Sequence, residues 1–136
     1  MLKDIHRETV EDIAIAIVPK LRVGDDSADL WEVYVINLKD QPIENVMVSS
    51  TGYGLREGEE VRTSVLRHFI GDMEPISYSM IEPIQEEVFG LNNEYWLSYY
   101  IGREIFDRKY VFLPESINED YFTRIPLLNR KGVMIL

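Results

Sequence analysis

Two histidines, His6 and His68, are the side chains best suited to act as a general base or a metal ligand at neutral pH. A histidine metal site needs two or three ligands close together, and these two residues lie far apart in the chain. We therefore expect no metal site. His68 shares a strand face with Leu66 and Ile70, which favours a hydrogen-bonded histidine in the core or at its rim over a general base.

Four serines are candidate nucleophiles, namely Ser49, Ser50, Ser64 and Ser98. None of them lies in a nucleophile elbow, and their spacing pairs none of them with a base and an orienting acid. The sequence contains no cysteine, which excludes thiolate catalysis, disulfides and zinc sites built on thiolates. We expect that the protein is not an enzyme and that it uses no cofactor.

Two short segments resemble ion-binding loops but depart from the spacing that such loops require. Residues 52–54 read Gly-Tyr-Gly, without the third glycine that a dinucleotide loop places before a helix, so we expect a tight turn. Residues 25–29 begin like a calcium loop, with oxygen-bearing side chains at alternate positions. However, Leu30 and Ile36 stand where that loop needs a glycine and a bidentate glutamate, which favours a plain acidic turn.

The most aromatic stretch of the chain, residues 94–101, could form a stacking platform for a sugar or a base. Alternation places Leu97 and Tyr99 on one face, and Trp96 and Tyr100 on the other. We expect this second face to be covered, because an exposed one would be a binding patch that single-domain proteins seldom leave bare. An alternative function is a small-ligand-binding or enzyme site near His68 and the aromatic strand, and the candidates for binding a ligand are Arg67, His68, Trp96 and Tyr100.

Short strands must position these side chains. In residues 30–38, Trp31, Val33 and Val35 point one way, and residues 43–49 alternate in the same manner after a turn. We expect these two segments to form an antiparallel hairpin. Further strands are predicted from about residue 13, over 61–70 and 76–81, over 94–101 as a central strand, and over 109–113 as its hairpin partner. Pro83 marks an edge, residues 85–91 a helical turn, and Ser116 with Glu119 a capping box.

About seven short strands, with no helix long enough for a βαβ crossover, predict an all-β fold. We expect two packed antiparallel sheets of the immunoglobulin or fibronectin-III type, with one or two short helical turns, and a barrel is the alternative. A chain of 136 residues without a linker is expected to form one domain over residues 1–136.

The net charge of −10 comes from 24 acidic and 14 basic side chains, and it repels phosphate backbones and anionic lipid headgroups. We therefore expect neither a nucleic-acid partner nor a membrane partner. The longest apolar run, residues 13–19, is shorter than the stretch of about 20 residues that crosses a bilayer. Acidic residues near the amino terminus are unlike a secretory signal, and this predicts a cytoplasmic location.

The carboxy-terminal end is basic and apolar, because residues 121–136 include Arg124, Arg130 and Lys131 and no acidic residue. Two interpretations stay open: the tail closes the core, or it docks on an acidic surface of its own chain or of a neighbour. We expect the protein to act by contact with protein and to pair with itself as a homodimer. The expected interface residues are Val133, Met134, Ile135 and Leu136.

Several segments resemble a group of small uncharacterised bacterial proteins with an immunoglobulin-like sandwich. The similar segments are residues 62–68, 91–95, 108–112, 116–119 and 130–133. Some members of that group carry the label phenylalanyl-tRNA synthetase subunit. Since no adenylation core fits in this length, the resemblance implies an accessory domain linked to tRNA aminoacylation. It also points to Arg67, His68, Asn92 and residues 130–132 as positions to test.

Overall fold

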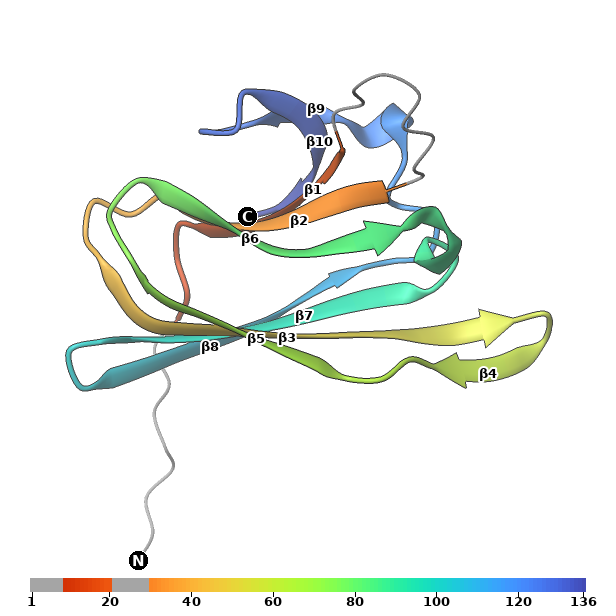
Figure 1. Cartoon of the computed structure of the whole chain (residues 1–136), viewed down its shortest axis with the longest axis horizontal. Coiled ribbons are helices and arrows are strands. Elements are labelled where there is room, and N and C mark those ends of the chain that lie inside the picture. Colours follow the sequence, from red (N-terminus) through yellow and green to blue (C-terminus); the bar gives the residue numbers. More distant parts are fainter. Residues whose placement is uncertain (1–8, 21–29) are drawn as a thin grey trace, which may run out of the picture.

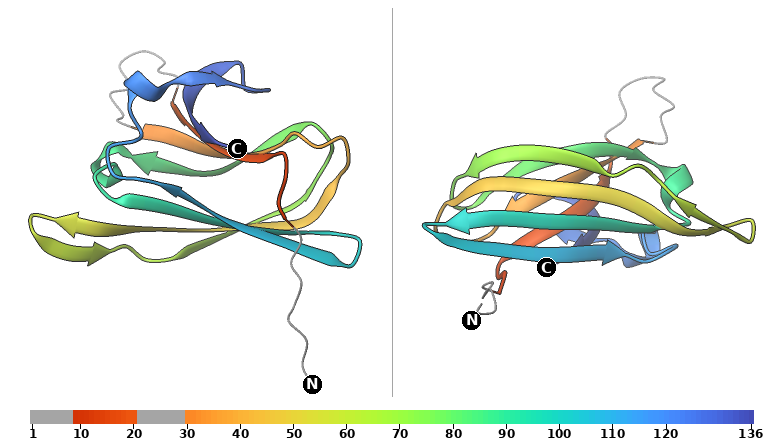
Figure 2. Two further views of the ribbon diagram at one scale, coloured as in Figure 1. Left: turned by 180° about the vertical axis from the view of Figure 1, so that it is seen from behind. Right: turned by 90° about the horizontal axis from the view of Figure 1, so that it is seen from below.

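The computed structural model of this protein describes residues 9–20 and 30–136. His6 and the acidic turn predicted over 25–29 lie outside the described residues. The described chain forms ten strands in two antiparallel sheets that face each other, as Figures 1 and 2 show. Two 3-10 turns, η1 (Glu86–Val88) and η2 (Glu119–Tyr121), lie in the connections. None of the described helical turns is long and apolar enough to span a bilayer.

The first sheet has the strand order β6-β2-β1-β10-β9. Its centre is β1, which pairs antiparallel with both β2 and β10. Pro83 lies in the edge strand β6, as predicted, where a missing amide is tolerated. The strands are β1 (Ile13–Pro19), β2 (Leu30–Asn37), β6 (Ser77–Gln85), β9 (Thr123–Ile125) and β10 (Arg130–Ile135).

The second sheet has the order β4-β3-β7-β8, and β5 also pairs with β3. The long strand β3 pairs with β5 along its first half and with β4 along its second half, so β4 and β5 form one interrupted edge. Strand β7 lies between β3 and β8, which confirms the predicted central position of the aromatic strand. The strands are β3 (Ile43–Arg56), β4 (Glu59–Arg62), β5 (Leu66–Met73), β7 (Asn92–Ile101) and β8 (Glu104–Phe112).

The predicted all-β sandwich of two antiparallel sheets is confirmed, while the immunoglobulin or fibronectin-III identity stays a prediction. The strand count is higher than the expected seven. The segment 61–70 divides between β4 and β5, and the carboxy-terminal segment adds β9 and β10. The tight turn expected at residues 52–54 is wrong, because Gly52 and Gly54 lie within β3. The turn itself is Glu57 and Gly58, which have φ angles of 52° and 81°.

The predicted hairpin between residues 30–38 and 43–49 is wrong. Strand β2 pairs with β1 and β6, whereas β3 pairs with β4, β5 and β7, so the connection crosses from one sheet to the other. The buried side chain of Asn37 holds this crossing, because its amide donates to the carbonyl oxygens of Gln41 and Glu74. Alternation shows which face of a strand is buried, but it does not identify the neighbouring strand.

The predicted capping box is also wrong. The side chain of Asn118, not that of Ser116, accepts from the backbone amide of Asp120 at 2.9 Å and caps η2. The Ser116 hydroxyl instead donates to the carbonyl oxygen of Leu113 at 2.6 Å. A side chain that bonds locally to its own turn is not available as a helix cap.

The main core lies between the sheets and contains the inward residues predicted for β2, Trp31, Val33 and Val35. The ring of Trp31 meets that of Phe89 edge-on at 5.1 Å between centroids. Tyr110 of β8 joins the two sheets directly, because its hydroxyl donates to the carbonyl oxygen of Ile13 in β1 at 2.6 Å. This hydrogen bond connects residues 97 positions apart in the chain.

The carboxy-terminal tail closes a second, smaller core on the outer face of the first sheet. Strand β10 pairs with β9 through residues 130–132 and with β1 through residues 133–135, and both β9 and β10 curl over that face (Figure 1). The buried residues of this second core are Ala14, Ala16, Val18, Ile36 and, from β9 itself, Ile125. The tail thus closes a core, as the first interpretation has it, and it also meets an acidic residue of its own chain, because Arg130 pairs with Glu32 at 3.0 Å. Val133 is buried, and Leu136 at the end of the chain is 56% exposed.

Candidate functional site

A β-bulge in β6 turns the side chain of Glu82 toward the second sheet. Met80 lies opposite Tyr34 of β2, and its side chain is on the face of the first sheet that points away from the second sheet. Strict alternation would put the side chain of Glu82 on that same face. The register shifts at this point, so that Ile81 is an extra residue and Glu82 lies opposite Val33 of the main core. Bulges re-aim side chains in this way. As a result, the side chain of Glu82 is only 10% exposed.

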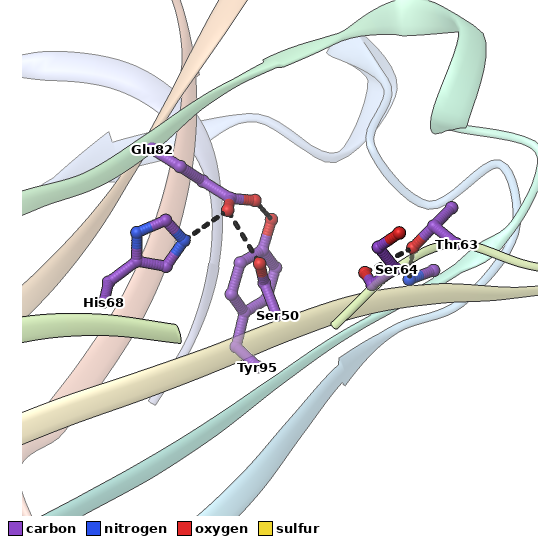
Figure 3. Close-up of polar contacts among 7 residues, drawn as sticks. Ser50, Thr63, Ser64, His68, Glu82 and Tyr95 are labelled. Atoms are coloured by element: carbon purple, nitrogen blue, oxygen red, sulfur yellow. Dashed lines mark hydrogen bonds and ion pairs between the residues drawn. The ribbon is translucent and has the colours of Figure 1, made fainter. Parts of the chain in front are cut away.

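The Glu82 carboxylate collects three hydrogen bonds from the other sheet, as Figure 3 shows. Its Oε1 atom accepts from the hydroxyl of Ser50 in β3 at 2.7 Å and lies 2.7 Å from Nε2 of His68 in β5. Its Oε2 atom accepts from the hydroxyl of Tyr95 in β7 at 3.2 Å. Residues from four strands therefore converge on one carboxylate between the two sheets.

Burial raises the pKa of the Tyr95 hydroxyl well above its usual value, and the negative charge of Glu82 raises it further. The phenol therefore stays protonated at neutral pH and acts as a donor to the carboxylate. This donor is held firmly, because the Tyr95 side chain is 1% exposed and its ring packs edge-on against that of Phe112 at 6.1 Å.

The carboxylate lies in a pocket of about 540 Å³ between the open edges of the two sheets. Most of the exposed lining surface is apolar, and polar groups lie both around Glu82 and on the facing wall, a combination typical of small-molecule sites. Leu66 at this edge is 52% exposed. The apolar part of the lining comes from Leu30, Leu66, Ile84 and Val88.

The break between β4 and β5 shapes the wall of the pocket opposite Glu82. The Thr63 hydroxyl accepts from the backbone amide of Gly52 at 2.8 Å and donates to the carbonyl oxygen of Ser64 (Figure 3). A Cβ atom on Gly52 would lie 3.3 Å from Cγ2 of Thr63, so a glycine here lets the interrupted edge approach β3 closely. Thr51, Thr63 and Ser64 thus bring hydroxyl groups to this wall.

Of the four residues predicted to bind a ligand, only His68 lines this pocket. Its hydrogen bond to Glu82 and its 24% exposed side chain agree with the histidine predicted at the rim of the core. Arg67 lies opposite Ser49 of β3, which in turn lies opposite Trp96 of β7. Arg67 and Trp96 therefore belong to the outer face of the second sheet, with the sheet between them and His68.

The expectation that the second aromatic face is covered is wrong. Trp96 is 46% exposed and Tyr100 is 39% exposed, because the tail packs on the other sheet. Phe69 of β5, 68% exposed, and Met47 of β3 lie opposite each other on the same outer face. We call these four residues, Met47, Phe69, Trp96 and Tyr100, the outer patch. The ammonium group of Lys109 lies 4.8 Å from the centre of the Trp96 ring.

Sequence reasoning missed Glu82, which is the centre of the site. No local signal marks it, because the bulge that turns it inward follows from pairing with β2. Ser50 was recognised only as one serine among several, without a partner. Tyr95 was recognised only as part of the aromatic strand; it lies on the inner face with Leu97 and Tyr99, and its hydroxyl could not be paired from spacing.

The arrangement favours binding over nucleophilic catalysis. A serine nucleophile needs a base at its hydroxyl, with a third group orienting that base. Here the Ser50 hydroxyl and the His68 imidazole both meet the same oxygen of Glu82. Within residues 9–20 and 30–136, no three His, Asp or Glu side chains are grouped in a way that could hold a metal ion.

Comparisons of the chain with protein-family models, with curated proteins and with solved structures find no match. The resemblance to the small bacterial group therefore stays a prediction, and the geometry of the site carries the functional argument.

Proposed function

We propose that this protein binds a small organic molecule in the pocket between its sheets, with Glu82 as the polar anchor. The observation that carries the proposal is a carboxylate that is held by three hydrogen bonds and lines a mostly apolar pocket of about 540 Å³. Ligand sites are commonly apolar clefts of about 300–1,000 Å³ with a few placed polar groups. We also propose a cytoplasmic location, since the chain has no cysteine.

A thermal-shift screen over small metabolites and nucleotides tests this proposal. We expect at least one compound to raise the melting temperature by about 5–10 °C at a concentration near 100 times its Kd. His68→Ala should reduce or remove that shift, because the substitution takes one donor from Glu82 and changes the pocket wall.

The matched control is Arg67→Ala, since Arg67 precedes His68 but lies on the opposite face of β5. The shift should persist in this variant. A screen in which no compound stabilises the protein, or in which the shift survives His68→Ala unchanged, contradicts binding in this pocket.

Self-association is a second candidate, and the outer patch is the observation that favours it. Its four apolar side chains are between 39% and 68% exposed on one sheet face, and exposed apolar patches commonly mark contact surfaces. The tail residues 133–136 fit this role less well. Residues 133–135 pair with β1, and Val133 is buried in the main core. We therefore propose a homodimer that is formed through the outer patch.

Light scattering tests the homodimer. We expect a dimeric mass for the full chain and a monomeric mass for Phe69→Glu, because a charge at the centre of an apolar contact loses its solvation without gaining a partner. Leu113→Glu is the control, since Leu113 is a comparable exposed side chain, at 62%, beyond the end of β8. A full chain that is monomeric at high concentration, or a Phe69→Glu variant that is still dimeric, contradicts this interface.

A further inference from the structure

The charge of the pocket lining is one-sided. Its acidic residues are Glu82 and Glu87, and the described lining residues include no lysine and no arginine. His68 is the nearest cationic partner of Glu82, and it carries a charge only when it is protonated. The whole chain adds a negative field, with a net charge of −10. An anionic ligand would therefore be repelled both by the pocket and by the protein around it.

Among the described residues, the Glu82 carboxylate has partners for three acceptor positions, which leaves one position unused. An ionised carboxylate offers about four lone-pair positions on its two oxygens. Ser50 and His68 occupy those of Oε1, and Tyr95 occupies one of those of Oε2. The remaining position on Oε2 needs a donor, because a buried charged group with unused hydrogen-bonding capacity is costly. The complementary ligand group is therefore a donor.

We propose that the ligand is an organic cation, specifically a primary amine with an apolar body; this inference rests on the proposed function of the pocket. The ammonium group donates to Oε2 of Glu82 and supplies the positive charge that the lining lacks. Hydrogen bonds between charged groups are shorter and about twice as strong as those between neutral ones. The apolar body of the ligand lies against Leu30, Leu66, Ile84 and Val88. These contacts are non-directional, so they require only that the ligand fits the pocket and buries apolar surface.

Isothermal titration calorimetry with matched probes tests the inference. The probes are amines, alcohols and carboxylates that share the same butyl, hexyl or benzyl body, measured at about pH 7, where the alkylammonium ion stays charged. We expect at least one amine to bind about tenfold or more tightly than its alcohol, as one charged hydrogen bond provides. The carboxylates should give no measurable heat of binding.

Glu82→Gln removes the charge while it keeps the size of the side chain. We expect this variant to lose about tenfold or more in affinity for the amine and to keep its affinity for the alcohol within about threefold. Glu94→Gln is the matched control. Glu94 is also a partly buried carboxylate, 17% exposed, but it lies in β7 beside Lys109 and not in the pocket lining. This control should bind the amine as the unmodified protein does.

Two outcomes would overturn the inference in different ways. If an alcohol or a carboxylate binds as tightly as its amine, or if Glu82→Gln leaves amine affinity unchanged, the cationic class is wrong and the pocket still binds ligands. If none of the probes binds and the metabolite screen is also silent, both the cationic class and the proposed function are wrong. Unchanged circular dichroism of Glu82→Gln confirms that a loss of affinity does not come from unfolding.

Discussion

A loss of about 3 kcal/mol in the free energy of unfolding is the expected result of replacing Gly132 with alanine. Gly132 lies in β10, where this strand passes close to β1. A Cβ atom at this position would overlap the carbonyl oxygen of Ile17 and would lie 2.6 Å from Cγ1 of Val18. Both neighbours are fully buried in the central strand of the first sheet, so neither can move without disturbing two cores.

Urea denaturation followed by circular dichroism measures this loss as a lower transition midpoint with an unchanged slope. Gly90→Ala is the control. A Cβ atom on Gly90 would meet only the carboxylate of Glu115, at 3.6 Å, which is an ordinary contact. Equal midpoints for the Gly132 and Gly90 variants would show that the approach of β10 to β1 is looser than the structure describes.

A steep loss of stability above about pH 10 is the second expected result, and its cause is the buried tyrosines of the second sheet. Burial raises the pKa of Tyr110 to about 12, with Arg108 partly offsetting the effect, and burial also raises the pKa of Tyr95 and Tyr99. The Tyr99 hydroxyl has no hydrogen-bond partner among the described residues, so ionisation there would be especially costly.

The direction of the pH effect follows from the proton balance. Between about pH 10 and pH 12 the unfolded chain releases the Tyr110 proton while the folded chain keeps it. The stabilising contribution is therefore complete below the unfolded pKa of 10.0 and is lost as the pH rises toward about 12. For Tyr110 alone the loss amounts to roughly 2–3 kcal/mol, and Tyr95 and Tyr99 add to it in the same direction.

Urea titrations at a series of alkaline pH values, read by circular dichroism and tyrosinate absorbance, measure this effect. Tyr110→Phe should lower stability at neutral pH by about 1–2 kcal/mol, because it leaves the carbonyl oxygen of Ile13 without its donor. The same variant should lose less stability between pH 10 and pH 12 than the unmodified protein. Tyr121→Phe, at a position that is 66% exposed, should change neither quantity. Equal losses of stability between pH 10 and pH 12 for Tyr110→Phe and the unmodified protein would contradict the prediction.

The fold class could be predicted because it depends on local alternation. Trp31, Val33 and Val35 share a face in the sequence pattern, and all three lie in the main core. The aromatic strand was likewise placed correctly in the middle of a sheet, with β8 as its partner. Strand neighbours could not be predicted in the same way. The short turn after β2 reads as a hairpin, but β2 and β3 lie in different sheets, and their apolar faces both contribute to the main core.

The candidate site was predictable only in part. His68 was correctly placed as a hydrogen-bonded histidine at the rim of the core, whereas its partner Glu82 gave no signal. Alternation from Met80 would place the Glu82 side chain on the outer face of the first sheet. The extra residue at Ile81 turns the Glu82 side chain to the inner face instead. The exposure of Trp96 was predicted wrongly because its cover also depends on tertiary structure. The carboxy-terminal tail packs on the first sheet and leaves Trp96 in the second sheet exposed.

The amino-acid sequence by itself determined that this chain forms half-buried strands, which side of most strands faces the core, and that no cysteine chemistry is present. These properties depend on residue type and on the two-residue repeat of a strand. Only the tertiary structure decided which strands are neighbours, where β6 bulges, and that Glu82, Ser50, His68 and Tyr95 meet in one pocket. Such contacts join four strands through side chains distant in the chain, and no local repeat encodes them.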